Sequence, residues 1–174
     1  KAGKRAVLIT MDIALLPREI CDAIKERLLD KYSLGTSDII LSWSHTHTGP
    51  VVRDDVFYDW LNLKPEETKK IDKYSAGLED QIVTVVGEAL KNMVPVKLYS
   101  GNGVTRFAVN RRNNTEANLT PLTPLNGPVD HSVPVIKITK STGEMLAVIF
   151  GYACHSTTLG IYQWTGDYPG FAQI

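Results

Sequence analysis

The sequence is short of the features that define several common classes of protein. Only two cysteines occur, Cys21 and Cys154, so there is no disulfide framework to infer. Lysine plus arginine number 19 and aspartate plus glutamate number 19, which leaves no net charge to attract nucleic acid. The longest apolar runs, such as residues 145–150, are far shorter than the roughly 20 residues that cross a bilayer. We therefore expect neither a nucleic-acid partner nor a membrane-spanning segment.

Export and catalytic motifs are also missing. Residues 1–5 run directly into an apolar stretch without a charged-then-apolar leader, although a chain that starts inside a longer protein would show none. There is no His-Glu-x-x-His helix, no Cys-x-x-Cys pair and no glycine-rich phosphate loop. The pair His45-Thr-His47 lacks the downstream Asp-His of the metallo-β-lactamase pattern. These absences exclude the best-known metal and nucleotide sites.

What is present indicates a soluble α/β domain. The chain has 174 residues, with 43% hydrophobic and 22% charged, which suits one folded domain or a piece of one. Branched apolar runs predict strands at residues 6–12, 39–43, 96–100, 135–139 and 145–150, the last two forming a hairpin around residues 140–144. Helical periodicity predicts helices at residues 17–32 and 65–93, with 54–61 a loop or short helix. Residues 101–110 are expected to be an irregular turn and 111–134 a long ordered loop.

The two predicted helices each have an apolar face that should cover the sheet. The face of the first comprises Ile20, Ile24, Leu28 and Leu29, and that of the second comprises Ile71, Tyr74, Leu78, Ile82, Val85, Val86 and Leu90.

Three of the four histidines follow predicted strands. In an extended backbone His45 and His47 project to the same side, because strand side chains alternate. His155 follows another apolar strand, so two strands ending on one edge of a single sheet would bring three imidazoles together. Neutral imidazole is a common zinc ligand, which predicts a metal site. A lone histidine at a strand end is more often a hydrogen-bonded surface residue, and only the grouping favours the site.

Other polar residues have two interpretations each. Arg111 could hold a carboxylate or an oxyanion, or belong with Arg112 to a solvated charge run. Asp167 could accept a ring N–H from a metal-bound histidine, or form the turn before a helix. Cys154 is expected to be a small packed residue. His131 is expected to be a loop residue without a catalytic role. The cluster at Ser156-Thr-Thr158 lacks the glycine elbow of a serine hydrolase.

Five segments, in this order, resemble those of one enzyme family. They are Ser44-His-Thr-His-Thr-Gly-Pro50, Phe107-Ala-Val-Asn-Arg-Arg112, Gly127-Pro-Val-Asp130, and Ala147-Val-Ile-Phe-Gly-Tyr-Ala-Cys-His-Ser156 with Gly166-Asp-Tyr-Pro-Gly170. Together they are similar to the amino-terminal catalytic domain of the neutral/alkaline, non-lysosomal ceramidase family. The resemblance covers nearly all of residues 1–174 and implies a layered αββα-type domain, with a mostly antiparallel or mixed central sheet and outer helices.

The resemblance also implies a function and a set of site residues. In that family a zinc ion activates water, which hydrolyses the amide bond of ceramide and releases a fatty acid and a sphingoid base. His45 and His155 match zinc ligands, His47 matches a residue that contacts substrate or the transition state, and Arg111 matches the arginine that lines the site. Asn110 and Asp167 are expected to support them or the substrate. The implied partner is a lipid amide, met at a membrane surface, and the implied location is secreted, periplasmic or at the cell surface.

The chain also departs from the family pattern. A glutamate, a tyrosine and a Gly-Asp-x-Ser segment of the family site lie beyond Ile174, and the family's opening strand precedes Lys1. We therefore expect a fragment that needs the remainder of its own chain and is inactive alone. Two alternatives stay open: a metal-dependent hydrolase of another amide or ester, and a degenerate domain without catalytic function.

Overall fold

The protein is described by a computed structural model that covers residues 3–114, 120 and 123–174. The described chain divides into two compact units. The first comprises Lys1–Met93 with Ser156–Ile174, and the second comprises Val94–His155. Part of the loop expected at residues 111–134 lies outside the described residues.

A pair of parallel strands forms the sheet of the first unit. Strand β1 (Val7–Met11) pairs with β2 (Ile39–Trp43) in a register that runs from Val7 opposite Ile39 to Met11 opposite Trp43. Helix α1 (Arg18–Tyr32) connects the two strands and begins directly after Pro17, whose missing N–H costs nothing at a helix start. This is a βαβ unit, the connection that parallel strands require.

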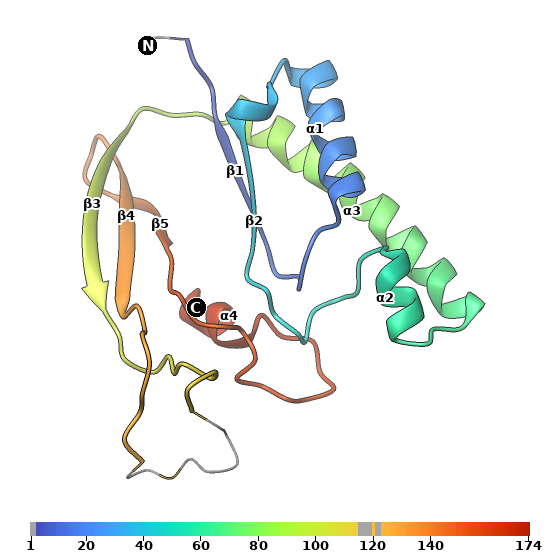
Figure 1. Cartoon of the computed structure of the whole chain (residues 1–174). Helices are drawn as coiled ribbons and strands as arrows, with labels where there is room; N and C mark the ends of the chain where they lie inside the picture. The colour runs from blue at the N-terminus through green and yellow to red at the C-terminus, as the bar shows by residue number, and fades with distance from the viewer. Residues whose placement is uncertain (1–2, 115–119, 121–122) are drawn as a thin grey trace. The chain divides into compact units, whose positions relative to one another are not determined.

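Helices α1 and α3 (Pro65–Lys91) lie against the same side of this sheet (Figure 1). The core between them is built from Ile20, Ile24 and Leu28 of α1, Ile82, Val83 and Val86 of α3, and Ile39 of β2. Outside the core, the guanidinium of Arg27 on α1 lies 2.5 Å from a carboxylate oxygen of Asp80 on α3. Apolar burial therefore holds the helices on the sheet, and an exposed ion pair adds little to it.

Two short helices complete the first unit. Helix α2 (Asp55–Trp60) has Asp54 as its N-cap, whose carboxylate accepts from the amide of Phe57 at 3.0 Å. Of the two structures expected for residues 54–61, the short helix is therefore the one observed. Helix α4 (Asp167–Ala172) lies near the end of the chain.

The second unit is a three-stranded antiparallel sheet in the order β3-β4-β5. Its strands are β3 (Val96–Val104), β4 (Ser132–Lys140) and β5 (Met145–Phe150). The predicted hairpin between β4 and β5 is confirmed, and Gly143 occupies a left-handed position in its turn at φ +92°. The irregular turn expected from Gly101 is wrong for its first part, because β3 continues to Val104 and pairs along its whole length with β4.

The α/β class with helices outside a mixed set of strands is confirmed, but one premise about the sheets is wrong. Among the described residues, β2 and β5, the strands that lead to the histidines, belong to different sheets. The predicted apolar faces of the helices also included residues that are exposed. Leu29 is 52% exposed and Val85 is 59% exposed, whereas Val83, which was left out of the predicted face, is buried.

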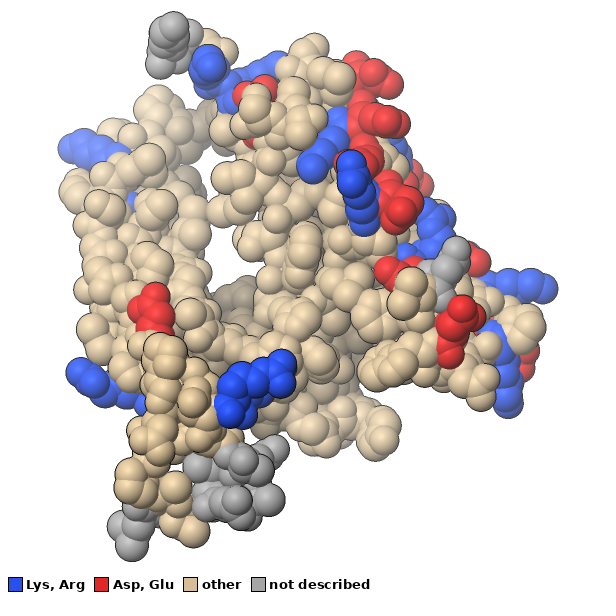
Figure 2. All heavy atoms as spheres, viewed as in Figure 1, with Lys and Arg blue, Asp and Glu red and all other residues tan. Residues whose placement is uncertain are grey.

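The surface shows where the charges lie. In Figure 2 most of the visible Lys, Arg, Asp and Glu side chains gather over the helices of the first unit. Among the described residues, no helix combines the length and the apolar composition that a membrane span needs.

Candidate metal centre

The backbone delivers His45 immediately after β2. The amide of Ser44 donates to the carbonyl of Met11 at 3.0 Å, and the amide of His45 donates to the carbonyl of Ile13 at 3.1 Å. At His45 the chain turns through the left-handed region, with φ 61°. This conformation is uncommon for a residue with a side chain, and strained residues of this kind cluster at functional sites.

A backbone carbonyl orients the ring of His45. Its Nδ1 is hydrogen-bonded to the carbonyl oxygen of Ala14. Because a carbonyl oxygen can only accept, Nδ1 carries the proton, and the Nε2 atom of a neutral ring keeps its lone pair. This is the arrangement by which proteins fix the tautomer of a metal-binding histidine.

The ring of His47 meets that of His45 edge to face. The ring centroids are 4.9 Å apart with an interplanar angle of 84°, and the two Nε2 atoms are 3.4 Å apart. Two nitrogens that each lie about 2.0–2.1 Å from a tetrahedral zinc ion are separated by about 3.3–3.4 Å. The spacing therefore suits a pair of imidazoles directed at the same ion. His45 is half-buried, whereas His47 is exposed.

His155 is the last residue of the second unit and follows β5 after a short connection. Its Nδ1 lies 3.4 Å from a guanidinium nitrogen of Arg111, so the two residues predicted for the site in this unit lie together. The next residue, Ser156, belongs to the first unit, where its hydroxyl donates to the carbonyl of Ser44 at 2.6 Å.

Asn110 organises the turn that presents Arg111. Its side-chain oxygen accepts from the amides of Arg112 at 3.0 Å and Asn113 at 3.1 Å, and its amide nitrogen donates to the carbonyl of Pro128 at 2.9 Å. Gly127 closes the same turn at φ +89°, where a Cβ atom would lie 2.5 Å from the side-chain oxygen of Asn113. These hydrogen bonds of its side chain hold the loop together, and the role predicted for Asn110 at the site stays a prediction.

Of the two interpretations of Asp167, its contacts fit the structural one, a residue in the turn before a helix. Its carboxylate is fully buried and accepts from the amides of Thr158, Leu159 and Tyr168 and from the hydroxyl of Thr158. None of the hydrogen bonds described for it reaches a histidine ring, so the predicted carboxylate–histidine contact is not observed. Burial acts to raise the pKa of Asp167, but the hydrogen bonds from Thr158, Tyr168 and Leu159 together lower it below its usual range. The residue is therefore held as the carboxylate.

Sequence reasoning missed the burial of the hydroxyl groups that adjoin the histidines in the chain. Thr46, Thr48 and Ser156 are buried, although threonine and serine are usually exposed. Thr46 and Thr48 alternate with His45 and His47 along the chain, and this spacing was the available signal, although the segment is not part of β2.

Two further residues were considered from the sequence. Cys154 is half-buried and forms no disulfide, and His131 is a half-buried loop residue just before β4. The Nδ1 atom of His131 is buried without a hydrogen-bond partner among the described residues. That neither residue takes part in the chemistry stays a prediction.

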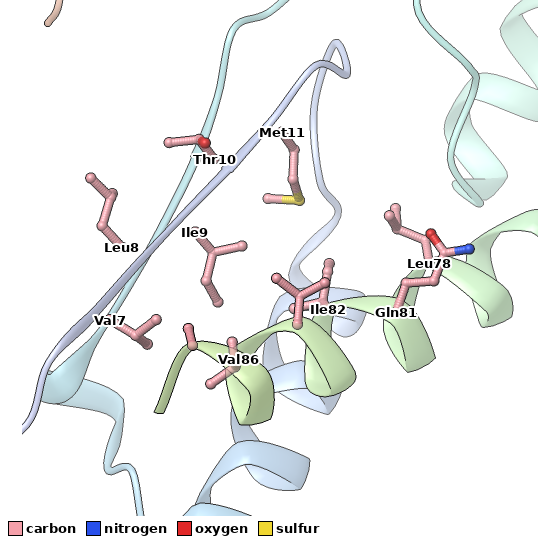
Figure 3. Close-up of a pocket in the computed structure, with 11 residues that line it drawn as sticks. Val7, Leu8, Ile9, Thr10, Met11, Leu78, Gln81, Ile82 and Val86 are labelled. Carbon is pink, nitrogen blue, oxygen red and sulfur yellow. The ribbon is translucent and has the colours of Figure 1, made fainter. Parts of the chain in front are cut away.

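A cleft of about 340 Å³ in the first unit lies elsewhere, between β1 and α3. Figure 3 shows Ile9 and Met11 of β1 pointing toward Ile82 and its neighbours on α3. Its lining is apolar apart from Thr10 and Gln81, and none of the lining residues has a titratable side chain that could act as a general acid or base at neutral pH.

Comparison with solved structures defines the class of fold: the chain has the fold of part of a ceramidase. One match is a ceramidase complexed with C2, at a TM-score of 0.76 and 22% identity. Another is the neutral ceramidase from Pseudomonas aeruginosa, at a TM-score of 0.73 and 24% identity. Each alignment covers 98% of this chain and 27% of the ceramidase chain, so this chain spans about a quarter of their length. No family model and no curated protein sequence matches the chain.

Proposed function

We propose that this chain supplies part of the metal centre of a ceramidase-like, zinc-dependent hydrolase, built around His45, His47 and His155. The observation that carries the proposal is the hydrogen bond from the ring of His45 to the carbonyl of Ala14, which leaves Nε2 of a neutral ring unprotonated, with Nε2 of His47 3.4 Å from it. A donor set of neutral imidazoles is chemically suited to zinc.

Chain connectivity supports adding His155 to the pair. Consecutive Cα atoms are about 3.8 Å apart, and the residue after His155 is hydrogen-bonded to the residue before His45 through the Ser156 hydroxyl and the Ser44 carbonyl, at 2.6 Å. The backbone of His155 is thereby tethered beside the start of the His45-Thr46-His47 segment. We assign His45 and His155 as ligands of the ion.

We assign His47 and Arg111 to the substrate. His47 is exposed, so its ring is open to a bound molecule, while the half-buried ring of His45 is tied to the backbone. Arg111 is also exposed and lies beside His155, where its guanidinium can donate hydrogen bonds to an oxygen that gains negative charge. When bound, zinc lowers the pKa of water to about 7 and polarises a carbonyl group.

The substrate class follows from the structural neighbours. Both are ceramidases, so we propose that the full-length protein hydrolyses the amide bond of an N-acyl lipid. The amide C–N bond is cleaved by water, which gives a fatty acid and an amine. Because the chain spans 27% of these neighbours, the catalytic unit is expected to need further residues of the full-length protein.

Metal analysis of the full-length protein tests this proposal. We expect about one zinc per chain by mass spectrometry, with that zinc lost in His45→Ala and in His155→Ala. Arg111→Ala should keep zinc and lose turnover of ceramide. His131→Ala is the matched control, because it removes the fourth histidine and should keep both zinc and turnover. A wild-type protein without metal, or zinc that survives both ligand substitutions, would contradict the proposal.

A further inference from the structure

The segment that carries His45 and His47 rests on buried hydroxyl groups. Thr46 is 0% exposed, and its hydroxyl donates to the carbonyl of Thr165 at 2.9 Å. The hydroxyl of Thr48 lies 3.1 Å from the same carbonyl and 2.7 Å from the hydroxyl of Thr165. Thr165 therefore holds the segment through the two buried threonines that alternate with the histidines.

Asp167 in turn fixes Thr165. The amide of Asp167 donates to the hydroxyl of Thr165 at 2.9 Å. The carboxylate oxygens of Asp167 accept from the hydroxyl of Thr158 at 2.7 Å and from the amide of Leu159 at 2.9 Å. Thr158 and Leu159 follow His155 and Ser156 by only a few residues. Both segments therefore connect to Asp167: the segment of His45 and His47 reaches its backbone amide through Thr165, and the segment after His155 reaches its fully buried carboxylate.

The backbone of Asp167 is also unusual. It lies in the left-handed region at φ 54°, although it is not a glycine. A buried, unpaired charge is costly in a protein unless hydrogen bonds satisfy it. Here one oxygen accepts from Thr158 and Tyr168 and the other from Leu159. Four donors from two neighbouring stretches of backbone are therefore organised around one side chain that touches no substrate-facing group described for it.

We propose that Asp167 is a positioning residue for the histidine site, acting through Thr165 on the His45-Thr46-His47 segment and through Thr158 and Leu159 on the segment after His155. This inference rests on the proposed metal function. It differs from a direct carboxylate–histidine contact, because the positioning passes through threonine hydroxyls and backbone amides.

Asp167→Asn is the first test variant. Asparagine has the same shape and tolerates the left-handed conformation, but its amide nitrogen cannot accept from the amide of Leu159 or from that of Tyr168. Thr165→Val is the second variant, because it removes the hydroxyl that accepts from the amide of Asp167 and contacts the hydroxyl of Thr48, and it leaves the carboxylate of Asp167 and the carbonyl of residue 165 in place. Leu28→Ala is the control. It truncates a buried core residue of the same unit and leaves every residue of the hydroxyl network as it is.

Two measurements on the full-length protein are needed. The first is zinc affinity by competition with a chromophoric chelator, where we expect Asp167→Asn to weaken binding about 10–100-fold, Thr165→Val to weaken it less, and Leu28→Ala to leave it within about twofold. The second is the imidazole ¹⁵N spectrum of the metal-free protein, in which wild-type His45 should show a single tautomer with the proton on Nδ1. Asp167→Asn should show a mixture of tautomers, and Leu28→Ala should not.

The outcomes separate the two proposals. If wild-type protein binds no zinc but Asp167→Asn still changes the tautomer of His45, the metal function fails and the positioning role stands. If wild-type protein binds zinc and both network variants keep its affinity and the tautomer of His45, the positioning role is overturned and the metal function stands. Equal loss of affinity in Leu28→Ala and Asp167→Asn would also overturn it, because the effect would then come from general destabilisation.

Discussion

His45 and Asp167 hold backbone conformations that their side chains disfavour. Among the described residues, four non-glycine residues have positive φ: Ser33, His45, Asn62 and Asp167. Ser33 is the C-cap of α1 and Asn62 follows the C-cap of α2, where the left-handed conformation is ordinary. His45 and Asp167 are not at such positions. Strain of about 1–3 kcal/mol at each is maintained by the surrounding hydrogen bonds, and both residues belong to the proposed site or to the network proposed to position it.

This strain predicts that glycine is more stabilising than alanine at position 45, the reverse of their usual order. Both His45→Gly and His45→Ala remove the ring, but only glycine adopts φ 61° without a Cβ penalty. We expect metal-free His45→Gly to be more stable than His45→Ala by about 1 kcal/mol, measured by urea unfolding. At position 47, where φ is not positive, His47→Gly should be no more stable than His47→Ala. Equal stability of the two position 45 variants would mean that the histidine is not strained.

The site residues were predictable to different degrees. The chemistry of imidazole singled out His45 and His47, and their rings do lie together, but they meet through a turn after β2 and not through the strand alternation that was expected. The roles of Asn110 and Asp167 do not, because a buried amide or carboxylate serves whichever donors the tertiary structure brings to it. Ser156 was noticed for its hydroxyl, but its partner, the carbonyl of Ser44, is 112 positions away in the chain and no local pattern indicates it.

The helices and strands were predicted well where the hydrophobic period is strong. Helices α1 and α3 and strands β1, β2, β4 and β5 lie within a few residues of their expected bounds. Errors occurred where periodicity does not determine the outcome. Strand β3 continues through Gly101 and Gly103 because β4 supplies its hydrogen-bond partners, which overrides the low strand propensity of glycine. Leu29 was assigned to the core, but the helix turns it to solvent one position after Leu28.

Helix α3 contains two glycines that predict opposite effects of the same substitution. At Gly77 an added Cβ would meet nothing within 4 Å, so Gly77→Ala should raise the free energy of unfolding by about 0.5–1 kcal/mol. At Gly87 the Cβ would overlap with the hydroxyl oxygen of Tyr32 and lie 2.7 Å from its Cζ.

Gly87→Ala should therefore lower the free energy of unfolding. To make room, the ring of Tyr32 must move and give up the hydrogen bond that its hydroxyl donates to the carbonyl of Val83 at 3.1 Å. Urea unfolding of the two variants side by side measures the difference. A gain in stability at both positions would show that Tyr32 moves away at no cost and does not pack against α3 as described.

For the whole molecule, the net charge could be predicted from the sequence, but the division of the strands between two sheets could not. The net charge of zero was read directly from the sequence. The separation of the strands into a parallel pair and an antiparallel triplet could not be read in this way. The sequence gives each strand's apolar pattern but not its partner, and the run of described hydrogen bonds in each sheet depends on residues up to 44 positions apart, as in Val96 opposite Lys140. Because strand pairing brings distant residues together, the proposed metal ligands must be tested in the folded protein.

Metal removal tests the site at this scale. An ion that binds the folded protein and not the unfolded chain adds about 2.7 kcal/mol of stability when its free concentration is 100 times its Kd. We expect the thermal midpoint of the full-length protein to fall after dialysis against EDTA and to recover with zinc. His45→Ala and His155→Ala should unfold at the same temperature with and without zinc, because each lacks a ligand, whereas His131→Ala should respond as the wild type does. If His155→Ala kept the full zinc-dependent rise in midpoint, the ion would be held by His45 and His47 without it. The tether from Ser156 to Ser44 would then serve the backbone alone.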